Sequence, residues 1–240
     1  MDKKTIILIT GGNAGIGYET VKLLSSTHPD THHILLSART LAKAESAIAS
    51  LGSPSNISPL ELDITSDTSI SAAVQAITTT YTRLDTLIHN AGTAGLDLPT
   101  STSLREKFQT VYNVNAISPF VLTSALEDLL DRSPLPKVIF VSSSLGSIAW
   151  LQAGYAFPRS EWYASSKAAL NHVAAYWARR KPGWKANAVC PGLNATGLNG
   201  LGMTEELHPR HGAGMVCGVV DEGFASWSGR FEGREGKVPW

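Results

Sequence analysis

The stretch Thr5-Ile-Ile-Leu-Ile-Thr10-Gly11-Gly-Asn13-Ala-Gly15-Ile-Gly17 joins an apolar run to a glycine-rich turn. Residues 5–10 are mostly β-branched and apolar, a composition typical of a buried parallel strand. Residues 18–26 then place apolar side chains at a spacing that predicts a helix. A strand, a glycine turn and a helix can together hold a phosphate. The glycines admit close backbone approach, and the helix N-terminus offers free N–H groups.

The three glycines are spaced Gly-x-x-x-Gly-x-Gly, which differs from the Gly-x-Gly-x-x-Gly dinucleotide fingerprint. A glycine-rich turn without a ligand is one interpretation of this pattern. The preceding Thr10 and the position directly after the first strand favour a dinucleotide site instead. The pattern Thr10-Gly11-x-x-x-Gly15-x-Gly17 resembles the cofactor loop of the short-chain dehydrogenase/reductase family.

The composition sets limits on the class of protein. A chain of 240 residues suits one α/β domain, here residues 1–240. Lys+Arg and Asp+Glu number 20 each, so nothing indicates a nucleic acid or an anionic membrane surface as a partner. Cys190 and Cys217 cannot form a disulfide framework, which favours a reducing interior. His208 and His211 lack a further ligand at suitable spacing, so we expect no metal site.

No apolar run is long enough for a secretory leader or a membrane span, because the first one covers only residues 6–9. We therefore expect a cytoplasmic protein with no membrane attachment.

Predicted strands and helices alternate along the chain. This order predicts a single-domain, Rossmann-type, doubly wound parallel sheet with helices on both faces. The further strands are expected at residues 33–38, 57–62, 84–89, 136–141, 185–190 and 229–232. The further helices are expected at residues 41–51, 67–81 with Asp67 as N-cap, 103–131 with a capping box at Ser103-Leu-Arg-Glu106 and a bend at Pro119, 162–180 and 213–220.

Two residues bear on the adenosine half of a dinucleotide. The second strand ends at residue 37 or 38, and Arg39 follows with no carboxylate beside it. An acidic residue there binds a free 2′-hydroxyl, whereas an arginine accommodates a 2′-phosphate, so the pattern favours NADP(H) over NAD(H). A solvated surface arginine is the alternative. Asp63 ends the third strand, where its carboxylate can accept from an adenine amino group or cap the next segment.

Two amide-bearing segments also match the family. Asn90-Ala91-Gly92 closes the fourth strand and resembles the family's Asn-Ala-Gly motif, although His89 stands where another Asn is commoner. Its small residues would let the backbone pass beside a nucleotide, and Asn90 can instead tie neighbouring strands together. The string Asn113-Val-Asn115-Ala-Ile-Ser-Pro-Phe resembles the segment whose second Asn holds a water beside the catalytic lysine.

The candidate catalytic residues follow the fifth strand. In Ser142-Ser143-Ser144-Leu-Gly146 the family pattern Ser-Ser-x-x-Gly selects Ser143, with Ser144 as the alternative. Tyr163 and Lys167 lie four positions apart, so they share one face of a helix. A Tyr-x-x-x-Lys pair is common by itself, but it becomes specific after a dinucleotide loop and a serine at a strand end.

The interval from Ser143 to Tyr163 is longer than is usual in the family. It predicts an extra loop at residues 150–161 beside the site. Apolar side chains of this loop would line a substrate pocket, or else pack on the domain surface; they are Trp150, Leu151, Tyr155 and Phe157.

After the sixth strand, Pro191-Gly192-Leu-Asn194-Ala-Thr196 resembles the family's Pro-Gly turn, whose backbone and threonine touch the nicotinamide carboxamide. The glycine-rich residues 197–202 are predicted to form a mobile substrate lid. The residues that we expect to bind the cofactor are Gly11, Asn13, Gly15, Ile16, Gly17, Arg39, Asp63, Asn90, Ala91, Gly92, Tyr163, Lys167, Pro191, Gly192, Asn194 and Thr196.

The resemblance implies hydride transfer between NADP(H) and a carbonyl or alcohol carbon. Tyr163 would protonate the new alkoxide, and its pKa should fall from about 10 because Lys167 and the nicotinamide are positively charged. Ser143 would hydrogen-bond the carbonyl oxygen, Lys167 would also hold the nicotinamide ribose, and Asn115 would carry a proton relay to solvent.

The ending Lys237-Val-Pro-Trp240 resembles carbonyl-reductase-like members of the family, many of them from filamentous fungi. An alcohol dehydrogenase that works mainly in the oxidative direction, or an NADP(H) sensor without redox chemistry, are the alternatives. Small and apolar faces at residues 116–130 and 164–175 predict a homodimer or homotetramer.

Overall fold

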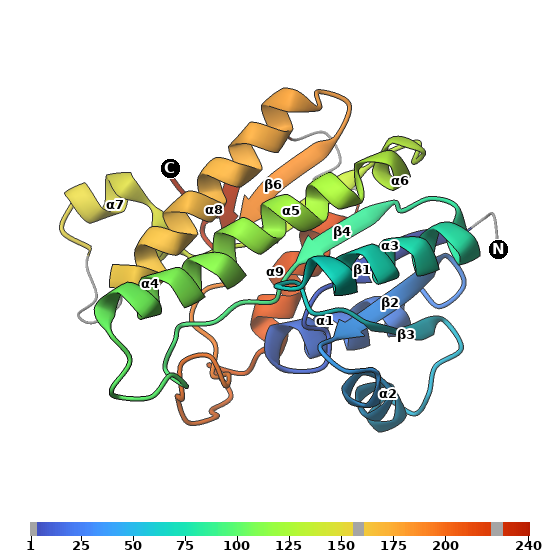
Figure 1. Cartoon of the computed structure of the whole chain (residues 1–240), viewed down its shortest axis with the longest axis horizontal. Helices are drawn as coiled ribbons and strands as arrows, with labels where there is room; N and C mark the ends of the chain where they lie inside the picture. Colours follow the sequence, from blue (N-terminus) through green and yellow to red (C-terminus); the bar gives the residue numbers. More distant parts are fainter. Residues whose placement is uncertain (1–3, 156–160, 222–227) are drawn as a thin grey trace.

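One sheet forms the centre of the molecule in the computed structural model, which describes residues 4–155, 161–221 and 228–240. The strand order is β3-β2-β1-β4-β5-β6-β7-β8, and all neighbours are parallel except β7 and β8 (Figure 1). The strands are β1 Thr5–Ile9, β2 His32–Ala38, β3 Ile57–Glu61, β4 Thr86–His89, β5 Lys137–Val141, β6 Lys185–Val189, β7 Phe231–Gly233 and β8 Gly236–Lys237. The expected doubly wound Rossmann-type sheet is therefore confirmed.

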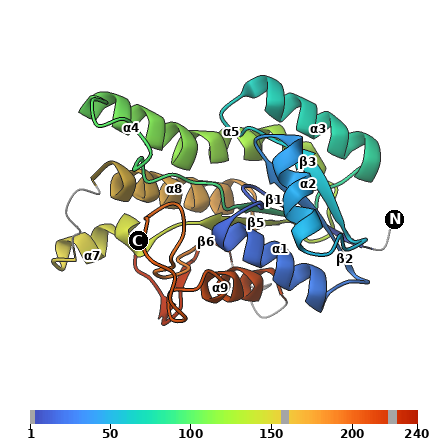
Figure 2. The ribbon, with the colours of Figure 1, turned by 90° about the horizontal axis from the view of Figure 1, so that it is seen from below.

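Helices cover both faces of this sheet, as Figure 2 shows. The helical segments are α1 Gly15–Thr27, α2 Leu41–Ser50, α3 Asp67–Tyr81, α4 Leu104–Tyr112, η1 Asn113–Ile117, α5 Ser118–Ala125, α6 Glu127–Asp131, η2 Ser144–Gly146, α7 Ile148–Gln152, α8 Glu161–Arg180 and α9 Arg210–Val220. Side chains of α3, α5, α6 and α8 form one apolar cluster with the sheet, and side chains of α1, α2 and α9 form the other.

The chain reverses its direction across the sheet at β1. This strand pairs with β2 on one side and with β4 on the other. In sheets of this kind, ligands bind at the carboxyl ends of the two strands beside such a reversal, here β1 and β4.

Two helix boundaries differ from the sequence-based expectation. Ser66, not Asp67, is the N-cap of α3, because the Ser66 side chain accepts a hydrogen bond from the Ser69 N–H. The expected long helix at residues 103–131 is interrupted before Pro119 by the π-helical segment η1. Pro119 then stands in the first turn of α5, where a missing N–H is tolerated. The expected capping box at Ser103 is confirmed.

The expected extra loop at residues 150–161 is partly wrong. Residues 148–152 form the short helix α7, which begins because the Ser147 hydroxyl accepts from the Trp150 N–H. Trp150 packs against the core cluster of α3, α5 and α8, whereas Leu151 and Tyr155 are exposed. Phe157 lies outside the described residues.

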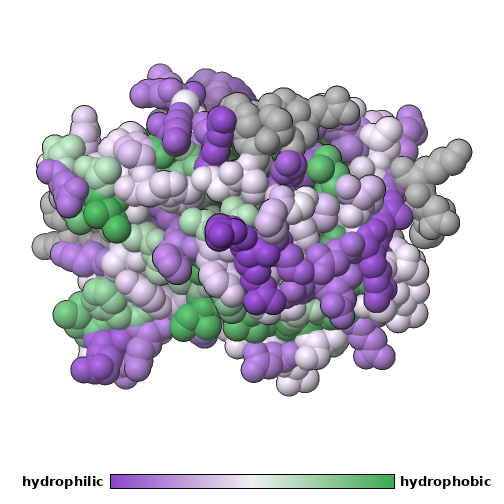
Figure 3. Space-filling model, turned by 90° about the horizontal axis from the view of Figure 1, so that it is seen from above, coloured by the Kyte–Doolittle hydropathy of each residue, from purple (hydrophilic) through white to green (hydrophobic). Residues whose placement is uncertain are grey.

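The outer surface carries both hydrophobic and hydrophilic side chains (Figure 3). Among the described residues, no helix is both long enough and apolar enough to cross a membrane. On the face drawn in Figure 3, hydrophobic side chains gather in small groups among hydrophilic ones.

Candidate active site

The glycine loop is held in place by Thr10 and Asn90. The Thr10 hydroxyl accepts from the backbone N–H groups of Asn90 at 2.9 Å and Ala91 at 3.0 Å. The Asn90 amide in turn donates to the carbonyls of Thr10 at 2.9 Å and Gly11 at 3.2 Å. Asn90 therefore ties β4 to the glycine loop, which is the structural alternative that the sequence left open for it.

Glycine is required at three positions of the loop. Gly11 and Gly15 have φ values of 63° and 55°, in the left-handed region that side chains disfavour. A Cβ at Gly17 would overlap the Asn90 amide and the Gly11 carbonyl oxygen. Helix α1 can therefore start directly beside the loop only because residue 17 has no side chain.

The first turn of α1 is open to an anion. Its N-cap, Ala14, makes no side-chain hydrogen bond, and no acidic residue stands in the first turn. Free N–H groups at a helix N-terminus favour a phosphate. Asn13 lies half-buried in the loop, and the Ile16 side chain packs against the core cluster of α1, α2 and α9.

The residues expected at the adenosine end differ in their surroundings. Arg39 is exposed at the end of β2. Asp63 caps the turn after β3, because its carboxylate accepts from the N–H of Thr65 at 2.9 Å and from the Thr65 hydroxyl at 2.7 Å. Sequence reasoning missed Glu61, whose carboxylate accepts from the Leu41 N–H at 3.0 Å and so stabilises the start of α2.

Ser143 and Tyr163 meet across the loop after β5. Desolvation raises the pKa of Tyr163 above its ordinary value, and a hydrogen bond with the Ser143 side chain partly opposes this effect. The Ser143 hydroxyl also accepts from the Leu145 N–H at 3.2 Å. Ser144 instead directs its N–H to the Cys190 sulfur at 3.1 Å. This geometry favours Ser143 over Ser144 as the serine beside the tyrosine.

Lys167 is 4% exposed and lies one turn after Tyr163 on α8. Its ammonium donates to the Val141 carbonyl at 2.8 Å and lies 5.7 Å from the centre of the Tyr163 ring. Burial lowers the pKa of Lys167 to about 8. The expected downward shift of the Tyr163 pKa is not found in this structure, because desolvation of the phenol raises the pKa and outweighs the lowering effect of the Ser143 hydrogen bond.

Asn115 sits inside the π-helical segment η1 and is fully buried. Its amide donates to the Thr93 carbonyl at 2.8 Å and to the Ser166 hydroxyl at 3.0 Å, and its oxygen accepts from the Thr93 N–H at 2.9 Å. A Cβ at Gly92 would lie 3.3 Å from the Asn115 oxygen and 3.7 Å from the Lys167 ammonium. Gly92 therefore keeps open the space between these two groups.

Asn171 was missed by sequence reasoning. Its side-chain oxygen accepts from the Ser142 hydroxyl at 2.6 Å, and its amide donates to the Gly146 carbonyl at 3.2 Å. A Cβ at Gly146 would lie 2.6 Å from the Lys167 carbonyl carbon, so the serine loop lies directly on α8. Asn171 thus fastens both ends of the segment that carries Ser143 to the helix that carries Tyr163.

The Pro191–Gly192 turn follows β6 at the same edge of the sheet. Gly192 has a φ of 75°, and a Cβ at Gly15 would meet the Thr196 methyl group at 3.2 Å. Thr196 therefore lies against the glycine loop. The Asn194 side chain is 3% exposed and its hydrogen-bonding capacity is used within the protein, so the expected contact of this residue with the cofactor stays a prediction.

One group of potential metal ligands occurs among the described residues, away from this site. His28, His32 and Asp221 bring their ligand atoms within 4.8 Å of one another. The two imidazole rings are stacked, with centroids 4.4 Å apart and an interplanar angle of 16°. Stacked, nearly parallel rings do not direct their lone pairs at a common point, so this arrangement is not a formed metal centre.

Known proteins resemble this chain over its whole length. The family model described as short chain dehydrogenase matches residues 5–206. The chain is 33% identical to the short-chain dehydrogenase/reductase eupG of Phoma sp., over 99% of this chain and 98% of that protein.

Solved structures agree with this match. The NADPH-bound carbonyl reductase from chicken fatty liver superposes with a TM-score of 0.85 at 26% identity, covering 99% of this chain and 100% of that one. Salutaridine reductase from Papaver somniferum gives a TM-score of 0.81 at 25% identity, covering 95% of this chain and 99% of that one. The chain therefore belongs to the short-chain dehydrogenase family of oxidoreductases.

Proposed function

We propose that this protein is an NADPH-dependent carbonyl reductase that converts a small or medium-sized ketone or aldehyde into an alcohol. One observation carries the proposal: Ser143 contacts Tyr163, and Lys167 lies on the same face of α8, at the sheet edge where the glycine loop also lies. The carbonyl reductase from chicken fatty liver is a structural relative that binds NADPH, which supports this assignment.

The residues present fit a dinucleotide. The open first turn of α1 suits a pyrophosphate, and Gly11, Gly15 and Gly17 leave room for its close approach. Asn90, Ala91 and Gly92 would border the adjoining part of the nucleotide, and Pro191, Gly192 and Thr196 the nicotinamide. NADPH, when bound, supplies the hydride.

Tyr163 would supply the proton. Because its pKa is raised, the hydroxyl is protonated at neutral pH, which is the form that a general acid needs. Lys167, with a pKa of about 8, is mainly charged at neutral pH and would stabilise the phenolate left after proton transfer. Ser143 would donate a hydrogen bond to the substrate oxygen as negative charge develops on it.

Asn115 would position the route by which Tyr163 is reprotonated. Its amide is fixed by Thr93 and Ser166, and its oxygen lies beside Gly92 on the side of Lys167. Such a fixed amide would hold a water beside the lysine, as the resemblance implies.

Arg39 would bind the 2′-phosphate that distinguishes NADPH from NADH. The carboxylate of Glu61, on the strand paired with β2, accepts from the Leu41 N–H, and no acidic residue directly follows β2 to accept from a free 2′-hydroxyl. The exposed Arg39 cation then favours the phosphorylated cofactor.

A turnover assay tests the proposed reaction. The purified protein is incubated with NADPH and a panel of ketones and aldehydes, and in parallel with NADP⁺ and the matching alcohols. Faster reduction than oxidation at neutral pH supports a reductase. Faster oxidation assigns an alcohol dehydrogenase, and cofactor binding without turnover of any substrate assigns a sensor.

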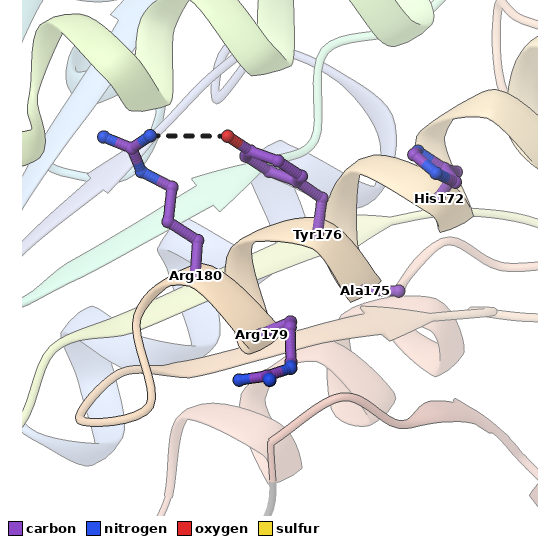
Figure 4. Close-up of a pocket in the computed structure, with 5 residues that line it drawn as sticks. All are labelled: His172, Ala175, Tyr176, Arg179 and Arg180. Atoms are coloured by element: carbon purple, nitrogen blue, oxygen red, sulfur yellow. Dashed lines mark hydrogen bonds between the residues drawn. The ribbon is translucent and has the colours of Figure 1, made fainter.

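We further propose a cytoplasmic homodimer or homotetramer built on α5 and α8. Ile117, Phe120 and Tyr176 are exposed large apolar residues, and the last two rings lie 5.5 Å apart. A groove of about 380 Å³ runs along α8 beside them. Figure 4 shows Tyr176 and Arg180 side by side on this helix, joined by a 3.4 Å hydrogen bond. The residues lining the groove are His172, Ala175, Tyr176, Arg179 and Arg180.

Light scattering tests this assembly. The unmodified protein at micromolar concentration should have at least twice the mass of one chain, and Tyr176→Glu should reduce it to the mass of one chain. A single-chain mass for the unmodified protein would rule the proposed contact out.

A further inference from the structure

The side chain of Arg234 joins the short hairpin of β7 and β8 to the turn after β6. Arg234, between these two strands, donates from Nε to the Pro191 carbonyl at 2.8 Å and from Nη2 to the Asn194 side-chain oxygen at 3.0 Å. A Cβ at Gly192 would lie 2.8 Å from the Arg234 Nε. The guanidinium therefore lies directly against the Pro191–Gly192 turn.

The Asn194 side chain joins the turn after β6 to helix α9 and to the β7–β8 hairpin. Its amide donates to the Gly192 carbonyl at 2.9 Å and to the Pro191 carbonyl at 3.2 Å. Its oxygen accepts from the Gly212 N–H at 3.0 Å and from Arg234. Two donors and two acceptor positions are thus all in use, which is the full capacity of an asparagine side chain.

The two groups that donate to the Asn194 side-chain oxygen are themselves fixed. A Cβ at Gly212 would lie 2.9 Å from the Asn194 amide nitrogen, so helix α9 can approach this closely only with glycine at that position. Strand β7 is held against β6 because the Cys190 N–H donates to the Glu232 carbonyl at 2.7 Å. Arg234 follows two residues after Glu232, so the sheet itself delivers it to the turn.

Resting on the proposed function, we propose that Arg234 is a positioning residue for the nicotinamide half of the cofactor site. It sets the conformation of residues 191–196 by fixing the Pro191 carbonyl and the Asn194 oxygen at once. The planar guanidinium presents N–H donors from two nitrogens at a fixed angle, whereas the ammonium of a lysine has one nitrogen to serve both acceptors. Without it, the Asn194 side chain loses one anchor and the turn becomes free to move.

Binding of two nucleotides separates this role from a general structural one. NADPH spans both halves of the site, whereas 2′,5′-ADP contains only the adenosine half. Arg234→Ala should weaken NADPH binding about tenfold, the effect of losing part-buried hydrogen bonds from a charged group. Its affinity for 2′,5′-ADP should stay within twofold of the unmodified protein. Fluorescence titration with NADPH and calorimetry with 2′,5′-ADP measure the two constants.

Two further variants complete the experiment. Lys237→Ala removes an exposed positive charge from the same hairpin and should leave both constants unchanged. Arg234→Lys keeps the charge and should weaken NADPH binding by an intermediate amount, and it replaces Arg234→Ala if the latter does not fold.

The outcomes distinguish a failure of the proposed function from a failure of the positioning role of Arg234. If the unmodified protein binds neither nucleotide, the proposed function fails. If it binds both and the Arg234 variants bind NADPH as tightly as it does, the positioning role is overturned. Equal weakening of NADPH and 2′,5′-ADP by Arg234→Ala would also overturn it, because the proposed role is confined to the nicotinamide half.

Discussion

Replacing Lys167 with methionine should stabilise the protein at neutral pH while it damages the site. The ammonium is almost fully buried, and burial lowers its pKa from the ordinary 10.5 to about 8. The folded protein therefore binds this proton less tightly than the unfolded chain does. The difference in pKa corresponds to about 3 kcal/mol of lost stability at pH 7.

The direction of the pH dependence follows from the same shift. Below the folded pKa of about 8, the burial of the charged Lys167 ammonium lowers the stability of the protein by the full amount. Between this value and the unfolded pKa of 10.5 the unfolded chain holds more protons, so the stability of the unmodified protein rises with pH. Methionine removes this dependence, but it also leaves the Val141 carbonyl without its 2.8 Å donor, at a cost of about 1–3 kcal/mol.

Urea denaturation of both proteins from pH 7 to 9.5 measures these terms. At pH 7 Lys167→Met should be the more stable by about 1 kcal/mol, and its advantage should fall by about 2 kcal/mol by pH 9.5, so that the order reverses. Lys22→Met, on the exposed side of α1, is the control and should show no such trend. A difference between Lys167→Met and the unmodified protein that stays constant with pH would refute the burial-driven shift.

Three further substitutions test separate parts of the site. Gly17→Ala puts a Cβ into occupied space, so it should lower the free energy of unfolding by about 1–3 kcal/mol and abolish NADPH binding. Its control is Gly214→Ala in α9, whose Cβ meets no atom within 4 Å and which should raise the free energy of unfolding, measured by urea denaturation, by up to about 1 kcal/mol. Arg39→Ala should raise the Michaelis constant for NADPH about tenfold and leave that for NADH unchanged; equal use of both cofactors by the unmodified protein would contradict this. Asn171→Ala should lower kcat about tenfold or more through misplacement of Ser143, with an unchanged dissociation constant for NADPH; an unchanged kcat would remove the positioning role.

The elements that the sequence predicted well are those with local signals. Strands β1, β2, β4, β5 and β6 are short apolar runs, and their ends were placed within two residues. The order of strands and helices was enough to predict the doubly wound sheet and the edge that carries the site. The glycine loop and the Tyr163–Lys167 pair have local spacing that marks them as candidates, whereas Ser143 was selected through the resemblance to the family.

The features that were missed depend on contacts between distant residues. Asn171 bonds the loop after β5, and Arg234 bonds residues that are 40 and 43 positions earlier, so neither has a local pattern that marks it. Glu61 reaches the start of α2 only because β2 and β3 are adjacent in the sheet. Asp67 was predicted as the N-cap of α3 because aspartate can cap a helix, but the preceding Ser66 can do so as well and is the N-cap in the structure. The π-helical turn at η1 concerns the pairing of backbone groups, which side-chain periodicity does not encode.

The rate of NADPH oxidation by Tyr163→Phe tests the central claim most directly. This substitution keeps the ring and the helix and removes only the hydroxyl that contacts Ser143. With the best carbonyl substrate of the unmodified protein, kcat should fall by a factor of about 10² to 10⁴, the usual contribution of a positioned general acid. The dissociation constant for NADPH should change little, because the glycine loop and Lys167 remain. Near-normal turnover by Tyr163→Phe on that substrate would mean that the proton comes from another group, and would contradict the role assigned to Tyr163.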